Sequence, residues 1–277
     1  MAAGELSDHA ERQAKPGIVG IPVFMYHEIV ESGQRSYSSP NLECCVTPEQ
    51  FRDHLMQIRQ GGYQVRSVRD IAEPGTCASR DHWVGITFDD GCSSDYEKAF
   101  PVLAEAGMRA DFFLNTANIG KPGYMNWAQI EEMRRSGMAF HSHGHSHVAL
   151  SMLSPRALER ELAMPRKIME DKLGCAVDFL AAPYGLLNRR VIQEAFRLGY
   201  RAVCNSRQWT ATAGSRVINR AAVLRRTSAK EFGRLLRRDP LPYVMRSLRS
   251  AVFYAPRQMM LKIQPAWLTV QVLEEKG

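Results

Sequence analysis

Hydrophobic and polar positions alternate in blocks from about residue 18 to about residue 204. Short apolar runs predict buried strands at 21–30, 83–88, 110–116, 138–140, 177–183 and 200–206. Between them, apolar residues at helical spacing predict helices at 47–62, 94–107, 126–137, 154–174 and 188–199. Strands and helices that alternate in this order form parallel sheets, so the pattern predicts an α/β protein.

Cap and breaker residues refine these helices. Thr47 and Gln50 have the spacing of a capping box, and Asn126 is a typical N-cap. Two prolines fall inside helical patterns. We expect Pro101 to bend its helix and Pro165 to interrupt the helix over 154–174.

The composition is that of a globular protein with one main domain. The chain has 277 residues, of which 45% are hydrophobic and 23% charged. We expect a flexible leader over 1–16, a main domain over 17–228 and a basic amphipathic extension over 229–277. The leader lacks the apolar core of a signal peptide, and no segment approaches the roughly 20 apolar residues of a membrane span. The sequence therefore predicts a cytoplasmic protein.

Positive charge is concentrated near the C-terminus. The net charge is +7, and the residues from Arg220 to Gly277 alone carry twelve Lys and Arg against four Asp and Glu. A basic tail on a near-neutral body favours an anionic surface or ligand over nucleic acid. Two interpretations of the tail stay open: helices lying on an anionic membrane, or a helical hairpin packed on the main domain with its arginines in water.

Polar side chains follow four of the predicted strands. Tyr26 and His27 follow the first, Asp89 and Asp90 the second, and the segment HSHGHSH, 141–147, follows the strand at 138–140. Pro183, Tyr184 and Gly185 follow the strand at 177–183. Because the carboxyl ends of parallel strands meet at one edge, we expect these residues to converge.

The acidic pair and the histidines together indicate a metal site. Asp89 and Asp90 would repel each other in a dry pocket unless a cation compensated their charge, although Asp-Gly after a strand is also a common turn. The segment 141–147 holds four of the chain's eight histidines. Either His141 with His145 or His143 with His147 could present two imidazoles on one side.

Two imidazoles and a carboxylate, with positions left for water, are typical of a catalytic zinc site. Cobalt, nickel and manganese are also accepted by such ligands, and Cys92 is a competing ligand close to the aspartates in sequence. The cofactor predicted from the residues is therefore one divalent metal ion, with zinc first.

Three motifs resemble a known family. TFDDG (87–91), SHGHSHVAL (142–150) and FLAAPYG (179–185) occur in the order of the polysaccharide deacetylases, carbohydrate esterase family 4, and the resemblance covers about residues 20 to 225. PVFMYHEIV (22–30) also resembles the subgroup that acts on poly-N-acetylglucosamine. The resemblance implies a distorted, TIM-barrel-like (β/α) barrel with about seven strands, and a metal-dependent hydrolase of carbohydrate metabolism that removes N-acetyl groups.

The resemblance also assigns roles to residues. It implies that Asp89 is the general base and that the metal ligands are Asp90, His143 and His147. Tyr184, after Pro183, matches the residue whose backbone amide helps to form the oxyanion hole, and both are implied to bind substrate. Trp209 matches a tryptophan that forms a wall of the pocket, although a core position explains it equally well.

Two features depart from the family pattern. FLAAPYG lacks the arginine that positions the base, and no histidine follows His147 to serve as the late acid. We predict His27 as the general acid, with His145 second.

The resulting prediction is an N-deacetylase for an acetamido sugar in the cytoplasm, with contact to the membrane surface through the basic tail. The substrate classes are a glycan precursor, a lipid-linked or nucleotide-linked sugar, or a glycosylated metabolite. A deformylase or amidase on a related substrate is the first alternative, and a catalytically silent carbohydrate-binding protein is the second.

Overall fold

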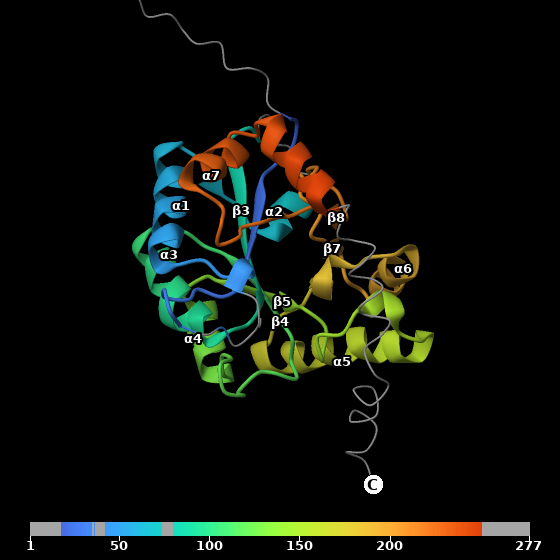
Figure 1. Ribbon diagram of the computed structural model, residues 1–277. Helices are drawn as coiled ribbons and strands as arrows, with labels where there is room; N and C mark the ends of the chain where they lie inside the picture. The colour runs from blue at the N-terminus through green and yellow to red at the C-terminus, as the bar shows by residue number, and fades with distance from the viewer. Residues whose placement is uncertain (1–17, 35, 37–41, 74–79, 251–277) are drawn as a thin grey trace, which may run out of the picture.

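The computed structural model describes residues 18–34, 36, 42–73 and 80–250. The predicted leader over 1–16 and residues 251–277 of the predicted extension lie outside this part. Figure 1 shows a sheet curled into a barrel, with helices on its outer face.

The sheet has nine strands in the described residues, and every ladder between them is parallel. They are β1 (Val23–Tyr26), β2 (Gln64–Val65), β3 (Trp83–Asp90), β4 (Asp111–Leu114), β5 (Ala139–Ser142), β6 (Phe179–Ala181), β7 (Ala202–Cys204), β8 (Val217–Ile218) and β9 (Ala221–Ala222). The order is β8-β7-β6-β5-β4-β3-β1-β9, and β2 pairs with β3 outside this path. The predicted distorted (β/α) barrel is confirmed. The hydrophobic pattern located six of these strands. The other three, β2, β8 and β9, have two residues each, too short to give a hydrophobic period.

The helices follow the strands in the predicted alternation. They are α1 (Pro48–Gln60), α2 (Val68–Ala72), α3 (Phe100–Glu105), α4 (Trp127–Arg135), α5 (Pro155–Leu173), α6 (Arg189–Arg197) and α7 (Ala229–Leu236). Short 3₁₀ turns are η1 (Leu42–Cys44), η3 (Leu150–Met152) and η4 (Pro183–Gly185), and η2 (Asp95–Ala99) is a π-helix. A further helix occupies residues 240–250, up to the last described residue.

Most local predictions are confirmed, and three differ in an informative way. The capping box at Thr47 forms, and Asn126 is the N-cap of its helix, where Gln129 completes a capping box as well. The strand predicted at 83–88 extends through both aspartates to become β3. Helix α5 runs through Pro165 without a break, and the distortion near Pro101 is the π-helix η2 that precedes α3.

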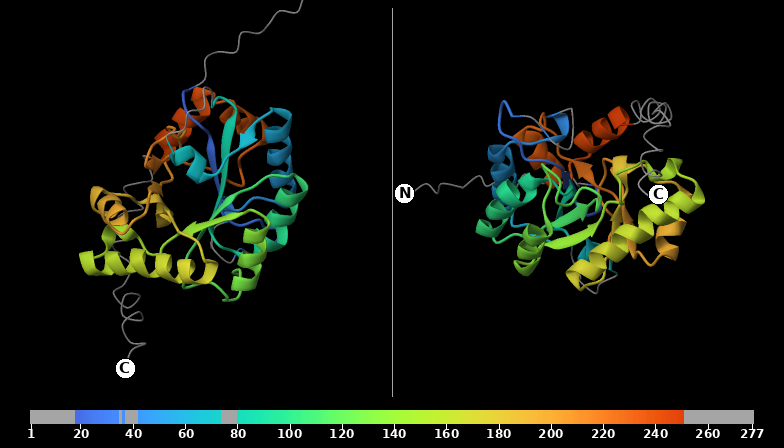
Figure 2. Two further views of the ribbon diagram at one scale, coloured as in Figure 1. Left: turned by 180° about the vertical axis from the view of Figure 1, so that it is seen from behind. Right: turned by 90° about the horizontal axis from the view of Figure 1, so that it is seen from below.

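Two hydrophobic clusters surround the sheet. The larger cluster lies between the strands and the helices, and Val84, Ile86 and Phe88 of β3 belong to it. Because side chains alternate along a strand, Thr87 and Asp89 point to the other side, into the barrel. There a smaller cluster, which includes Phe113, fills the interior. Figure 2 shows from behind and from below that the long helices α1 and α5 lie outside the strands.

The barrel remains open at one seam. Among the described residues no ladder joins β8 to β9, although only Asn219 and Arg220 separate these two strands. The Arg220 side chain is fully buried at this seam. No helix of the described residues combines the length and the apolar character that crossing a membrane requires.

Candidate metal centre and active site

The predicted convergence of strand ends is present for three side chains. Asp90 ends β3, and His143 and His147 lie in the loop that follows β5. One ligand atom from each residue lies within 4.8 Å of the other two. Segments more than fifty residues apart in sequence thus meet at the carboxyl rim of the barrel.

Asp90 presents a carboxylate oxygen to both histidines. Its Oδ1 lies 3.1 Å from Nε2 of His147 and 3.5 Å from Nε2 of His143. This oxygen is buried and accepts no hydrogen bond of good geometry. Burial alone would raise the pKa of Asp90, but the contact with His147 and the charges of the surrounding histidines hold it well below its usual range. The carboxylate is therefore ionised and available to a cation.

His143 is oriented by a backbone carbonyl. Its Nδ1 lies 2.9 Å from the carbonyl oxygen of Ala181, and because a carbonyl only accepts, Nδ1 carries the proton. Nε2 then has its lone pair on the side of Asp90. Burial lowers the pKa of His143 to about 4, so its ring is neutral at pH 7, as a metal ligand must be.

The geometry selects one of the two histidine pairs. His141 points into the barrel, where its Nε2 lies 2.9 Å from Oδ1 of Asp111, and Nδ1 of His145 lies 2.8 Å from Oγ1 of Thr116. Neither ring joins the group of Asp90, His143 and His147, and Cys92 is not part of that group either. A carboxylate and two imidazoles fit one divalent ion with further positions open.

Left-handed backbone is concentrated at this rim. Four non-glycine residues in the described chain have positive φ, and three of them are Asp90 (81°), His147 (57°) and Tyr184 (62°). Such conformations cost of the order of 1 kcal/mol or more and persist only where the surroundings enforce them. The Tyr184 ring lies against His147, with 4.9 Å between the ring centroids.

Asp89 is held by a buried arginine. Two nitrogens of Arg220 donate to the two carboxylate oxygens of Asp89, at 2.6 and 2.7 Å. The remaining contacts of the guanidinium go to Thr87 Oγ1, at 3.2 Å, and to the carbonyl of Asn205, at 3.1 Å. Its plane also lies over the Phe113 ring, at 5.1 Å. The guanidinium is thus fixed from several sides.

This pair sets the charge of Asp89. Burial would raise the pKa of Asp89, but the attraction of Arg220, the nearby His143 and the hydrogen bonds from Arg220 outweigh that effect and lower it. Asp89 is therefore an ionised carboxylate at neutral pH.

Arg220 corrects an inference made from the sequence. The arginine partner of the base is absent from FLAAPYG, but the structure supplies one from the seam between β8 and β9. The signal in the sequence was a single arginine inside the apolar run VINRAAV, 217–223. A lone cation in such a run indicates a buried ion pair.

Glu161, a second residue missed in the sequence, fixes the histidine loop. Its carboxylate is 8% exposed and accepts from the backbone N–H groups of His145 and Ser146, both at 3.0 Å, and from the Ser146 hydroxyl. Glu161 lies on the buried face of α5, beside Leu158 and Leu162. A glutamate on an apolar stripe was the available signal.

The other predicted residues are placed as follows. His27 follows β1, and its Nδ1 is buried and has no hydrogen-bond partner among the described residues. Pro183 is buried at the start of η4, next to Tyr184. Trp209 packs edge-on against Tyr243, with 5.9 Å between centroids, and contributes to the core around the helix over 240–250. Its role as a pocket wall stays a prediction.

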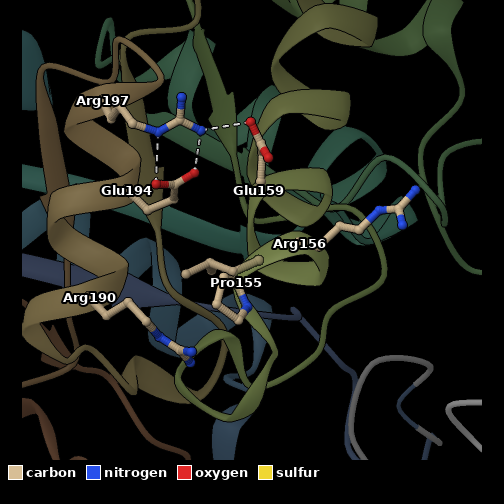
Figure 3. Close-up of a pocket in the computed structure, with 7 residues that line it drawn as sticks. Pro155, Arg156, Glu159, Arg190, Glu194 and Arg197 are labelled. Atoms are coloured by element: carbon tan, nitrogen blue, oxygen red, sulfur yellow. Dashed lines mark hydrogen bonds and ion pairs between the residues drawn. The ribbon is translucent and has the colours of Figure 1, made fainter.

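Two cavities lie away from these residues. One, of about 300 Å³, lies between α5 and α6, and Figure 3 shows that Arg197 there bridges Glu194 and Glu159. The other, of about 800 Å³, is at the amino ends of β4 and β5, where Asp111 and Ala139 line it. Neither cavity contains a residue of the rim site.

Comparison with known proteins identifies the domain. Residues 78–203 match the polysaccharide deacetylase family. A putative polysaccharide deacetylase of Bacillus subtilis is 27% identical over 217 residues, which are 77% of this chain and 75% of the relative. A poly-beta-1,6-N-acetyl-D-glucosamine N-deacetylase of Staphylococcus epidermidis is 26% identical, over 57% of this chain and 63% of the relative.

A solved structure agrees with the fold. The Streptococcus pyogenes deacetylase PplD, in complex with acetate, superposes with a TM-score of 0.72 and 26% identity. The match covers 79% of this chain and 98% of that one.

The Arg220–Asp89 pair gives a first prediction. Arg220→Met leaves a buried carboxylate without its counter-charge, so we expect a loss of about 3–5 kcal/mol in the free energy of unfolding at pH 7. Because Asp89 has a lowered pKa when folded, the pair contributes above the unfolded pKa of about 4 and is lost as the pH falls through the folded value.

In Arg220→Met burial raises the pKa of Asp89 without the opposing arginine, so the variant's carboxyl becomes protonated as the pH falls and its destabilisation is relieved. The difference between wild type and Arg220→Met should therefore shrink as urea unfolding is repeated from pH 7 towards pH 4. Arg189→Met, at an exposed site, is the control. An unchanged difference across this range would contradict the role of Arg220.

Glu161 gives a second prediction. Glu161→Ala leaves three loop donors without their acceptor, so we expect a loss of about 2–4 kcal/mol and faster hydrogen exchange at the amides of His145 and Ser146. Glu161→Gln keeps a carbonyl oxygen for the two N–H groups and should largely preserve their protection. Glu159→Ala, two residues away on the exposed side of α5, should change neither quantity.

Proposed function

We propose that this chain, which carries a polysaccharide deacetylase domain, is a metal-dependent hydrolase that removes the acetyl group from the nitrogen of an acetamido sugar. The family identity supports deacetylation of an acetylated polysaccharide. One observation carries the finer proposal. Asp89, an ionised carboxylate, directly precedes Asp90 in the sequence, and Asp90 forms the candidate metal site with His143 and His147. The names of the staphylococcal relatives support an N-acetylglucosamine unit.

Asp90, His143 and His147 would hold one divalent ion, with zinc first and cobalt, nickel or manganese as alternatives. When bound, such an ion supplies positive charge that polarises the amide carbonyl and makes a water molecule more acidic. The protein fixes the ligands in advance through the Ala181 carbonyl on His143 and through Glu161 on the loop.

Asp89 serves as the general base. Its carboxylate accepts the proton of the attacking water, and Arg220 keeps it ionised and fixes both of its oxygens. Arg220 thereby weakens the alternative of a silent binding protein, because that interpretation rested partly on a missing arginine.

His27 serves as the general acid that protonates the leaving amine. An interaction with His27 is among the causes that lower the pKa of Asp89 and of Asp90, which supports its assignment to this centre. His145 is the weaker candidate, because its Nδ1 is engaged by Thr116 on the other side of the loop. The backbone amide of Tyr184 is proposed to stabilise the oxyanion, with Pro183 and Trp209 beside the sugar.

The cytoplasmic location and the choice among glycan precursors remain predictions. Release of formate or ammonia in place of acetate would favour the deformylase or amidase alternative.

Two variants distinguish the role of the metal ligand from the role of the general base. Chelation should abolish acetate release from N-acetylglucosamine oligomers, and added zinc should restore it. We expect Asp89→Asn to bind zinc with unchanged affinity while turnover falls by about 10² to 10⁴, whereas Asp90→Asn should lose zinc binding as well. Equal zinc loss in both variants, or acetate release that survives chelation, would contradict the proposed roles.

The acid is tested with two leaving groups. An amine must be protonated to leave, but an aryl oxide need not be. We expect His27→Ala to reduce deacetylation of an N-acetyl sugar by about 10² or more while hydrolysis of an aryl acetate changes little. His145→Ala should leave this ratio near the wild-type value. If His145→Ala instead lost deacetylation selectively, His145 and not His27 would be the general acid.

A further inference from the structure

The helix over 240–250 is fastened to the barrel by one face. Tyr243 is fully buried and donates from its hydroxyl to the Leu235 carbonyl at the end of α7. Arg246 is 9% exposed, pairs with Glu231 at 2.7 Å and donates to Thr227 Oγ1 at 2.8 Å. Ser247 donates to the carbonyl of Gln208, in the loop after β7. This helix therefore has a fixed orientation.

The opposite face is apolar and exposed. The docking stripe, as we name it, consists of Leu241, Val244, Met245 and Leu248, which are 54%, 41%, 44% and 59% exposed. Their spacing of three, four and seven residues places them on one side of the helix. Figure 2 shows this helix, in red, at the outer edge of the molecule when the molecule is viewed from below.

This concentration is unusual within the protein. The described residues contain seven large hydrophobic side chains that are exposed, and four of them form the docking stripe. The other three, Val19, Met56 and Met152, are far apart in sequence and lie on different segments. A contiguous apolar stripe on a fixed helix marks a contact surface, whereas single exposed residues do not.

Positive charge borders the stripe. Arg237 lies in the turn before the helix and Arg249 near its last described turn, and both are exposed. Residues 240–250, which form this helix, contain no acidic side chain. Apolar residues on one face with arginines at its margin are typical of helices that lie in the headgroup region of an anionic bilayer.

We propose that the docking stripe binds the protein peripherally to a bilayer that contains anionic lipids. Leu241, Val244, Met245 and Leu248 enter the boundary between headgroups and acyl chains, and Arg237 and Arg249 contact lipid phosphates.

Charge favours an anionic bilayer as the partner of the docking stripe over a second copy of the chain and over residues 251–277. A symmetric dimer through the stripe would bring its arginines against those of a second copy, and like charges oppose such a contact. Residues 251–277 contain three basic and two acidic side chains, so they offer no net negative charge to complement the arginines. Phe253, Tyr254 and Trp267 in that segment are residue types that favour a membrane interface.

The test uses the full chain and vesicles of defined composition. Wild type should co-sediment with vesicles of phosphatidylcholine mixed with phosphatidylglycerol, and binding should weaken with rising salt. Leu241→Ser/Leu248→Ser should lower the partition coefficient by at least about tenfold. Val19→Ser/Met56→Ser, which removes exposed apolar surface elsewhere, should bind as wild type does.

Other outcomes overturn the proposal. No binding to anionic vesicles, or equal binding by the Leu241→Ser/Leu248→Ser variant, would show that the stripe does not dock on lipid. A concentration-dependent dimer that this variant abolishes, without lipid binding, would assign the stripe to a second copy. The inference does not depend on the proposed function, because vesicle binding is measured without turnover. Where the proposed function holds, both doubly substituted variants should release acetate from a water-soluble substrate at the wild-type rate.

Discussion

The ion pair between Asp89 and Arg220 is the constraint on which the rim site depends. A carboxylate inside the barrel would be protonated or would destabilise the fold unless a cation accompanied it. Arg220 meets this requirement with two hydrogen bonds to the carboxylate and none of its side chain exposed. The charge that the barrel needs for stability is the same charge that the proposed base needs for catalysis.

The positions of Asp90 and the histidines follow from the backbone around this pair. Asp90 comes directly after Asp89, and a positive φ turns its side chain away from the strand alternation and towards the loop after β5. Glu161 holds that loop by its amides, so that His147 can also adopt a left-handed conformation. The accuracy of the site is therefore a property of β3, β5 and α5 together.

The sequence predicted those elements whose hydrophobic residues repeat with the period of a strand or a helix. Long strands, capped helices and the convergence of strand ends were foreseen because alternation and parallel topology determine them. Strands of two residues, such as β8 and β9, have no period to detect. The continuity of α5 was also missed, because Pro165 predicts an interruption, whereas buried residues before and after it keep the helix continuous.

The candidate site was predictable where its residues are close in sequence and hidden where they are distant. TFDDG and HSHGHSH indicated a metal centre, but two possible histidine pairs could be separated only by the partners of each ring. Arg220 and Glu161 act from other elements, and only the fold brings them to the rim. The sequence left two interpretations of the basic extension, contact with a membrane or packing on the main domain. Its described part packs on the barrel by one face and leaves its apolar face exposed to solvent.

The seam between β8 and β9 has a consequence for biosynthesis. Asp89 and Arg220 are separated by 131 residues, whereas the three proposed ligands all precede residue 148. A ribosome thus delivers the ligand segments long before it delivers the arginine, so a nascent chain contains every proposed ligand but no working base. Completion of the barrel and formation of the Asp89–Arg220 pair are therefore a single event.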